Sequence, residues 1–115
     1  MIDIYGIKNC DTMKKALKWL DENGVAYNFH DYKREGADAA LLEKAIETHG
    51  WENVINKRGT SWRKLDDQIK ANMDAYGAKI AAINHPVLIK RPMVVANDDI
   101  VLGFDPDIFS EKWKA

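Results

Sequence analysis

Residues 2–20 read IDIYGIKNCDTMKKALKWL and contain the only cysteine of the chain, Cys10. Apolar and polar residues alternate from Ile2 to Tyr5, and this alternation predicts a β-strand. From Asp11 onward the apolar residues recur every three or four positions, which predicts a helix that ends near Gly24. Cys10 therefore lies where a strand gives way to a helix, and this junction decides what the thiol can do.

A second strand is predicted after this helix, because bulky apolar side chains alternate there at Val25, Tyr27 and Phe29. Two strands joined by a single crossover helix lie parallel, with a right-handed connection. The last third of the chain returns to sheet. Its two predicted strands, residues 93–96 and 100–102, are joined by a three-residue loop and form a hairpin.

The middle of the chain, residues 36–84, has helical periodicity, and three helices are expected there. Ser61 is the expected cap of the second helix and Asn72 of the third, while His85-Pro86 ends the third. A final helix starts at Asp105-Pro106. The order strand-helix-strand, helices, strand-strand-helix predicts an α/β fold.

The 115 residues are enough for one domain. Residues 1–35 and 85–115 form its expected core, and residues 36–84 form a helical insert. The charged fraction is 30% and the net charge is −1, which does not favour nucleic acid. The start of the chain does not look like a signal peptide, and no apolar run could cross a membrane. A lone cysteine fits a reducing compartment, so we expect a cytoplasmic protein. We also expect it to be a monomer.

The position of Cys10 predicts an activated thiol, because helix N-termini and nearby cations stabilise a thiolate. Lys8 and Lys14 would lower its pKa, whereas Asp11 would raise it. Gly6 would let the preceding loop turn without steric cost. The alternative is an inert structural cysteine, since free cysteines are often buried.

An internal disulfide exchange is excluded, because the second cysteine of a Cys-x-x-Cys motif is replaced by Met13. A mixed disulfide at Cys10 must then be resolved by glutathione or by a thiol of a partner protein. His30 and His49 have no cysteine or carboxylate cluster at ligand spacing, so no metal site is expected.

Three further stretches, together with Cys10, carry a resemblance to a known family: NKRGTSWRKL (56–65), HPVLIKRPMVV (85–95) and LGFDPDIF (102–109). The sequence resembles the arsenate reductase family of the thioredoxin superfamily, in the branch of Spx-type regulators and YffB-like reductases. The resemblance implies a thioredoxin-like fold with an all-helical insert between the second and third strands.

The resemblance also implies roles for single residues. Pro92 would be the cis-proline opposite Cys10, and Arg91 would contact the anion bound at the thiol. Arg58 matches the arginine of the insert, although its neighbour Lys57 remains an alternative. A guanidinium suits these roles because it binds carboxylates and oxyanions bidentately.

Two positions depart from true arsenate reductases. Phe104 stands where those enzymes have a third arginine, and Gly6 stands where they have a histidine. Both departures argue against arsenate as the main substrate.

We therefore expect a thiol-dependent oxidoreductase in which Cys10 is catalytic. The residues expected to bind the substrate or glutathione are Arg91, Arg58, Lys8, Asn9 and Pro92. Glutathione is the expected co-substrate, and a glutaredoxin-type protein is an expected partner. The alternatives are an arsenate reductase coupled to glutathione or glutaredoxin, and an Spx-type regulator that binds RNA polymerase. The regulator is disfavoured by Met13, which removes the dithiol switch.

Overall fold

The computed structural model describes residues 1–114, and the chain divides into two compact units. The core unit comprises Met1–Glu35 and the residues from Arg91 onward, and the helical unit comprises Gly36–Lys90. The second break falls at Arg91 rather than at residue 85, because the preceding residues pair within the helical unit. The N–H of Lys90, for example, donates to the carbonyl of Val54.

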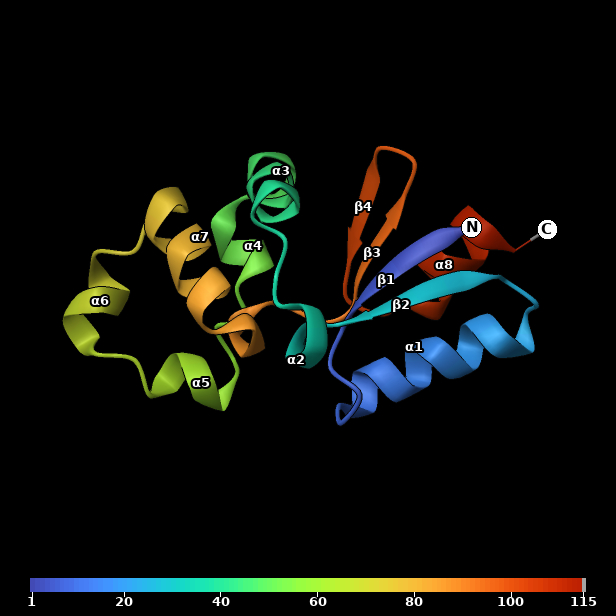
Figure 1. The fold of residues 1–115 in the computed structure, drawn as a ribbon, viewed down its shortest axis with the longest axis horizontal. Coiled ribbons are helices and arrows are strands. Elements are labelled where there is room, and N and C mark those ends of the chain that lie inside the picture. Colours follow the sequence, from blue (N-terminus) through green and yellow to red (C-terminus); the bar gives the residue numbers. More distant parts are fainter. Residues whose placement is uncertain (115) are drawn as a thin grey trace. The chain divides into compact units, whose positions relative to one another are not determined.

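The core unit is built on a four-stranded sheet in the order β2-β1-β3-β4 (Figure 1). Its strands are β1 (Ile2–Gly6), β2 (Tyr27–Asp31), β3 (Met93–Ala96) and β4 (Asp99–Leu102). As predicted, β1 and β2 are parallel, while β1–β3 and β3–β4 are antiparallel. The helices of this unit are α1 (Asp11–Glu22), α2 (Tyr32–Glu35) and α8 (Pro106–Trp113).

Helices α1 and α8 cover one face of this sheet, because their apolar stripes share a core with alternate strand residues. The fully buried members of this core are Ile4, Met13, Ala16, Leu20, Val94 and Phe109. Phe109 lies at its centre, with edge-to-face contacts to Phe104 and Trp113 at 4.9 Å between ring centroids. The final helix begins as expected, since the Asp105 carboxylate accepts the N–H of Asp107.

The hairpin between β3 and β4 is tighter than the sequence suggested. Asp99 is the first residue of β4 and pairs with Ala96, so the loop has only two residues, Asn97 and Asp98. Asn97 takes a φ of 56°, a left-handed conformation that asparagine tolerates better than most residues. The expected three-residue loop was wrong.

The helical unit contains five α-helices and a 3₁₀ helix within its described range, Gly36–Lys90. They are α3 (Ala39–His49), α4 (Trp51–Val54), α5 (Thr60–Arg63), α6 (Asp67–Ala71), α7 (Ala75–Asn84) and η1 (Pro86–Leu88). No helix within residues 1–114 is long and apolar enough to cross a membrane.

Two of the expected helix starts in this unit were wrong. Ser61 lies inside α5, and the helix expected to continue from it is broken before α6, whose cap is Asp66. Asn72 ends α6 rather than starting α7, which is capped by Asp74. In both cases the carboxylate accepts a backbone N–H of the first turn, a bond that Ser61 and Asn72 do not make.

Candidate functional site

Cys10 occupies the N-cap position of α1, directly after the loop that leaves β1. Its backbone is extended, with φ −139° and ψ 125°, and its side chain is half-buried. The thiol does not cap the helix in the usual way, but the backbone N–H groups of Met13 and Thr12 face the sulfur and lower its pKa. The first turn of α1 is therefore arranged to stabilise a thiolate.

The topology of the sheet brings Arg91 to the same place. Strands β1 and β3 are antiparallel neighbours, and Tyr5 near the end of β1 pairs with Met93 at the start of β3. The loop after β1 and the residues before β3 therefore leave the sheet at one edge. Arg91 is half-buried there and hydrogen-bonds to the Cys10 sulfur.

Opposing effects set the pKa of Cys10. Burial raises the pKa, whereas the N–H of Met13, the hydrogen bond and charge of Arg91, and the N–H of Thr12 lower it. The lowering effects prevail, so the pKa of Cys10 lies below the ordinary value of 9.0. A larger thiolate fraction at neutral pH makes Cys10 a better candidate for a nucleophile than for an inert core residue.

The Arg91–Pro92 peptide bond is cis, as the family resemblance implied. Pro92 is buried, and its carbonyl accepts the N–H of Gly103 just beyond β4, at 2.8 Å. This hydrogen bond fixes the start of β3, next to Arg91, against the end of β4.

Gly6 makes a close contact with Met13 that sequence reasoning missed. It is buried at the end of β1, and it is not among the glycines with a positive φ. A Cβ at this position would overlap the sulfur of Met13 and lie 2.8 Å from its methyl carbon. Gly6 thus allows α1 to pack closely on β1, rather than allowing the loop to turn.

Lys8 and Asn9 are exposed in the loop before α1. Lys8 is not among the groups that shift the Cys10 pKa, so the sequence-based expectation that it activates the thiol gains no support. A role of Lys8 or Asn9 in binding a ligand stays a prediction.

Arg58 lies in the helical unit, on the exposed loop between α4 and α5. Its neighbour Lys57 is engaged within that unit: its ammonium lies over the rings of Trp51 and Trp62, and 3.4 Å from Glu52. The role of Arg58 or Lys57 toward the thiol remains a prediction.

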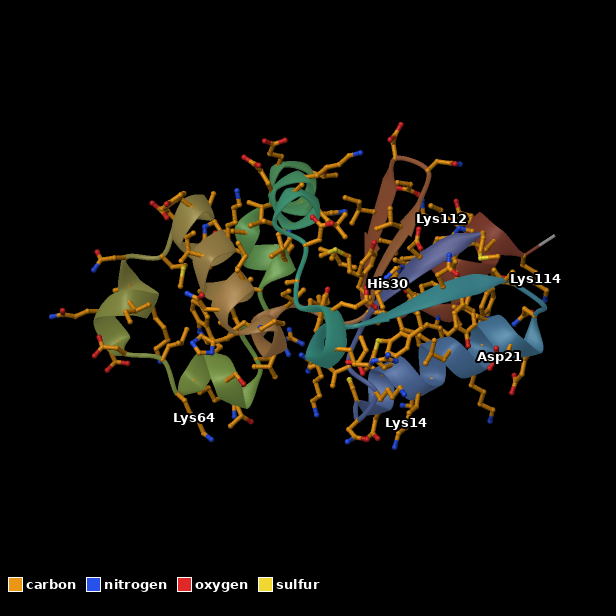
Figure 2. The ribbon with its side chains drawn as sticks, viewed as in Figure 1. Lys14, Asp21, His30, Lys64, Lys112 and Lys114 are labelled. Carbon is orange, nitrogen blue, oxygen red and sulfur yellow. The ribbon has the colours of Figure 1, made fainter. Side chains whose placement is uncertain are left out.

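His30, labelled on β2 in Figure 2, belongs to a cluster that the sequence did not indicate. Its Nε2 lies 2.9 Å from Asp3 and its Nδ1 lies 3.0 Å from Glu35, while its ring stacks on Tyr5 at 4.4 Å. Burial lowers the pKa of His30, but the two carboxylates raise it above its ordinary value of 6.5. Spacing along the sequence did not indicate these two partners of His30, because Asp3 reaches it only through the pairing of β1 with β2.

Tyr32, at the start of α2, is buried beside this cluster and stacks on Tyr5, with 6.5 Å between ring centroids. Burial raises the pKa of Tyr32, and the charge of Arg91 acts in the opposite direction. The charge of Arg91 therefore acts on Tyr32 as well as on Cys10. No group of three His, Cys, Asp or Glu side chains among residues 1–114 is placed to hold a metal ion.

The profile of the ArsC family matches residues 5–111. An uncharacterized protein of Haemophilus influenzae is 44% identical over 105 residues, which cover 91% of this chain and 92% of the relative. The solved structure of the YFFB (PA3664) protein has a TM-score of 0.93 at 45% identity, covering 96% of this chain and 97% of its own.

An arsenate reductase (ArsC) related protein from Brucella melitensis has a TM-score of 0.78 at 42% identity, covering 96% of this chain and 92% of its own. A more distant relative, the global transcriptional regulator Spx of Streptococcus mutans, is 24% identical over 93% of this chain and 79% of its own length. These similarities confirm the expected α/β, thioredoxin-like fold.

Proposed function

The chain belongs to the ArsC family, and we propose that it is a thiol-dependent reductase whose single nucleophile is Cys10. The observation that carries this proposal is the hydrogen bond from Arg91 to a half-buried sulfur at the start of α1. The guanidinium and two backbone N–H groups stabilise the thiolate, and the partly exposed sulfur remains accessible to a substrate. A cytoplasmic location and a monomeric state are part of the proposal.

The reaction begins when the Cys10 thiolate attacks one sulfur of a substrate disulfide. The old disulfide bond breaks, a mixed disulfide forms at Cys10, and the other sulfur leaves as a thiolate that takes up a proton. Arg91 stabilises negative charge on the sulfur atoms during this exchange.

Resolution needs a thiol from outside the chain, because Cys10 is the only cysteine. One glutathione thiolate attacks the mixed disulfide and releases the second substrate thiol, leaving glutathione on Cys10. A second glutathione attacks this adduct, which yields glutathione disulfide and regenerates the Cys10 thiolate. The substrate disulfide gains two electrons and two glutathione molecules lose one each. A glutaredoxin-type protein is the partner we propose for the last step.

The test is the pH dependence of Cys10 alkylation, followed by reaction with glutathione disulfide and mass spectrometry of the intact protein. We expect a pKa below that of an unperturbed thiol and one glutathione adduct that added glutathione removes. An ordinary pKa with no adduct would overturn the proposal.

Arsenate is the alternative substrate within the same chemistry. Phe104 packs against Phe109 in the core, so the turn after the hairpin has an aromatic ring where arsenate reductases have an arginine. We therefore expect arsenate-dependent oxidation of glutathione to be slower than disulfide reduction. A faster reaction with arsenate would reverse this order.

A transcriptional regulator is the second candidate function, and the similarity to Spx favours it. Met13 removes the dithiol that a Cys-x-x-Cys switch needs. Capture of RNA polymerase by both the native protein and Cys10→Ser would support a regulator that does not depend on the thiol. If neither captures the polymerase, the reductase remains.

A further inference from the structure

Three segments of the core unit leave its sheet at one edge (Figure 1). The strands β1 and β2 are parallel, and Gly6 at the end of β1 lies opposite Asp31 at the end of β2. Tyr5, just before Gly6, pairs with Met93 at the start of β3. The loop to Cys10, helix α2 and the residues before β3 therefore start from the same edge. The proposed reaction uses the first and the third of these segments and gives α2 no role.

Helix α2 is a single turn whose start is fixed by two buried side chains. The carboxylate of Asp31 accepts the backbone N–H of Lys33 at 3.0 Å. The ring of Tyr32 stacks on that of Tyr5, with 6.5 Å between centroids. An isolated turn of helix is not stable in water, so the position of α2 depends on such contacts at both of its ends.

The other end of α2 is held by His30 of β2. The Nδ1 of His30 lies 3.0 Å from Glu35 of α2, and its Nε2 lies 2.9 Å from Asp3 of β1. The ring stacks on Tyr5, and the amide of Asn28 donates to the same Asp3 carboxylate at 3.4 Å. Only a protonated imidazole carries an N–H on both nitrogens, so only this form donates to both carboxylates.

The surroundings of His30 decide which contact breaks when its proton is lost. The charged groups that act on it are Asp3 and Glu35, and Tyr5 covers its ring. Burial lowers the pKa of His30, but the two carboxylates outweigh it and raise the pKa. A neutral ring has one N–H for two carboxylates. Glu35 has 53% of its side chain exposed against 39% for Asp3, so we expect Glu35 and the end of α2 to be released first.

The release of α2 matters to the thiol because of Tyr32. Burial raises the pKa of Tyr32, as does Tyr5, whereas the charge of Arg91 lowers it. The phenol therefore stays uncharged, and the charge that acts on it also stabilises the Cys10 thiolate. A buried, uncharged ring keeps water away, and charges that water screens less interact more strongly.

We propose that His30 is a positioning residue for the thiol site. By bonding both carboxylates at once, it holds α2 in place and keeps Tyr32 buried within reach of the charge of Arg91. When His30 is neutral, the end of α2 is released, water approaches Arg91, and the Cys10 thiolate is stabilised less. This role rests on the proposed function, because it makes the reactivity of the same thiol depend on the proton of His30.

The test is the alkylation rate of Cys10 in the full chain from pH 5 to pH 10, with the titration of His30 followed by NMR of its imidazole ring. Below the pH at which His30 titrates, we expect His30→Gln and Glu35→Gln each to slow alkylation about three-fold, because water then screens Arg91. Above that pH the three proteins should react equally fast, since α2 is released in all of them.

The sign of the Glu35→Gln effect separates positioning from long-range charge. Removing a negative charge would by itself favour the Cys10 thiolate and speed its alkylation, whereas loss of the bond to His30 slows it. His30→Arg has two donor groups at every pH, so it should react faster than the native protein above the pH at which His30 titrates. Glu22→Gln is the matched control and should leave the rate unchanged, because Glu22 is an exposed carboxylate at the end of α1 that pairs with Lys18.

Two results would overturn this role: a faster rate in Glu35→Gln, or a low Cys10 pKa that neither variant changes. The second result leaves the proposed function intact, whereas an ordinary Cys10 pKa in the native protein overturns both. The side chain of Glu35 is exposed, so Glu35→Gln gives an answer even where His30→Gln does not fold.

Discussion

Arg91 stabilises the Cys10 thiolate by a hydrogen bond and by its charge, and both act on a half-buried sulfur. Arg91→Gln should therefore raise the pKa of Cys10 and slow its alkylation at neutral pH, on the order of ten-fold. Arg91→Lys should recover part of the rate, because it keeps the charge but not the planar group. The measurement is the alkylation rate from pH 5 to pH 10.

Lys14→Gln is the matched control for this prediction. Lys14 is an exposed cation on α1, four residues beyond the thiol (Figure 2), and it is not among the groups that shift the Cys10 pKa. We expect its removal to leave the alkylation profile unchanged. If Lys14→Gln slows alkylation as much as Arg91→Gln does, general positive charge rather than a specific contact activates the thiol.

Gly6 and Met13 form a contact that limits what position 6 can hold. Gly6→Ala should destabilise the protein by about 1–3 kcal/mol, since the extra methyl group overpacks a buried site. The double variant with Met13→Ala should lose less than the sum of the two single losses, because the smaller side chain gives the methyl group room. Urea unfolding of the four proteins measures this difference. Simple additivity would show that the contact does not restrict position 6.

The N-cap of helix α1 is occupied by a reactive thiol rather than by a residue that caps the helix well. Cys10 is its N-cap residue but makes no capping hydrogen bond, whereas serine is one of the preferred caps. Cys10→Ser should therefore abolish disulfide exchange and, at acidic pH, raise the free energy of unfolding by about 0.5–1 kcal/mol. Urea unfolding at pH 5 checks the second effect. A less stable variant would indicate that the cysteine was placed there for packing.

The amount by which Cys10→Ser raises the free energy of unfolding should shrink as the pH rises. The folded pKa of Cys10 is lowered, so its thiolate contributes stability that is fully present above the unfolded value of 9.0 and is lost as the pH falls through the folded pKa. Serine does not titrate in this range. A constant difference between the two proteins from pH 5 to pH 9 would contradict the lowered pKa.

The elements of the core unit followed from local signals in the sequence. Alternation identified β1, helical spacing identified α1, and Asp105-Pro106 identified the start of α8. The helical unit was less predictable, because its helices are short and start at residues that helical spacing does not single out: α5 follows Gly59 without a side-chain cap, and α6 and α7 are capped by aspartates. Asp66 starts α6 and Asp74 starts α7, and periodicity alone does not distinguish Asp74 from its neighbour Asn72 as a cap.

The candidate site depends on contacts between distant parts of the chain. The sequence indicated Cys10 from its own neighbourhood, but Arg91 and the cis bond before Pro92 came only from the family resemblance. The register of β1 against β3 is what brings Arg91 to the thiol. Asp3 meets His30 in the same way, through strand pairing that no local pattern specifies.

His30 and Cys10 make the free energy of unfolding depend on pH in opposite directions. The carboxylates of Asp3 and Glu35 outweigh the effect of burial and raise the pKa of His30. Protonated His30 therefore contributes stability that is fully present below the unfolded pKa of about 6.5. This contribution is lost as the pH rises through the folded pKa, whereas that of Cys10 grows toward alkaline pH.

Measurement in a Cys10→Ser background isolates the histidine. There we expect the free energy of unfolding to fall between pH 5.5 and pH 8.5, and His30→Gln to remove most of this fall, because glutamine keeps no charge for the two carboxylates. His85→Gln is the control, since His85 is exposed at the end of α7. If His85→Gln flattens the profile and His30→Gln does not, the link from β1 through His30 to α2 does not stabilise the fold.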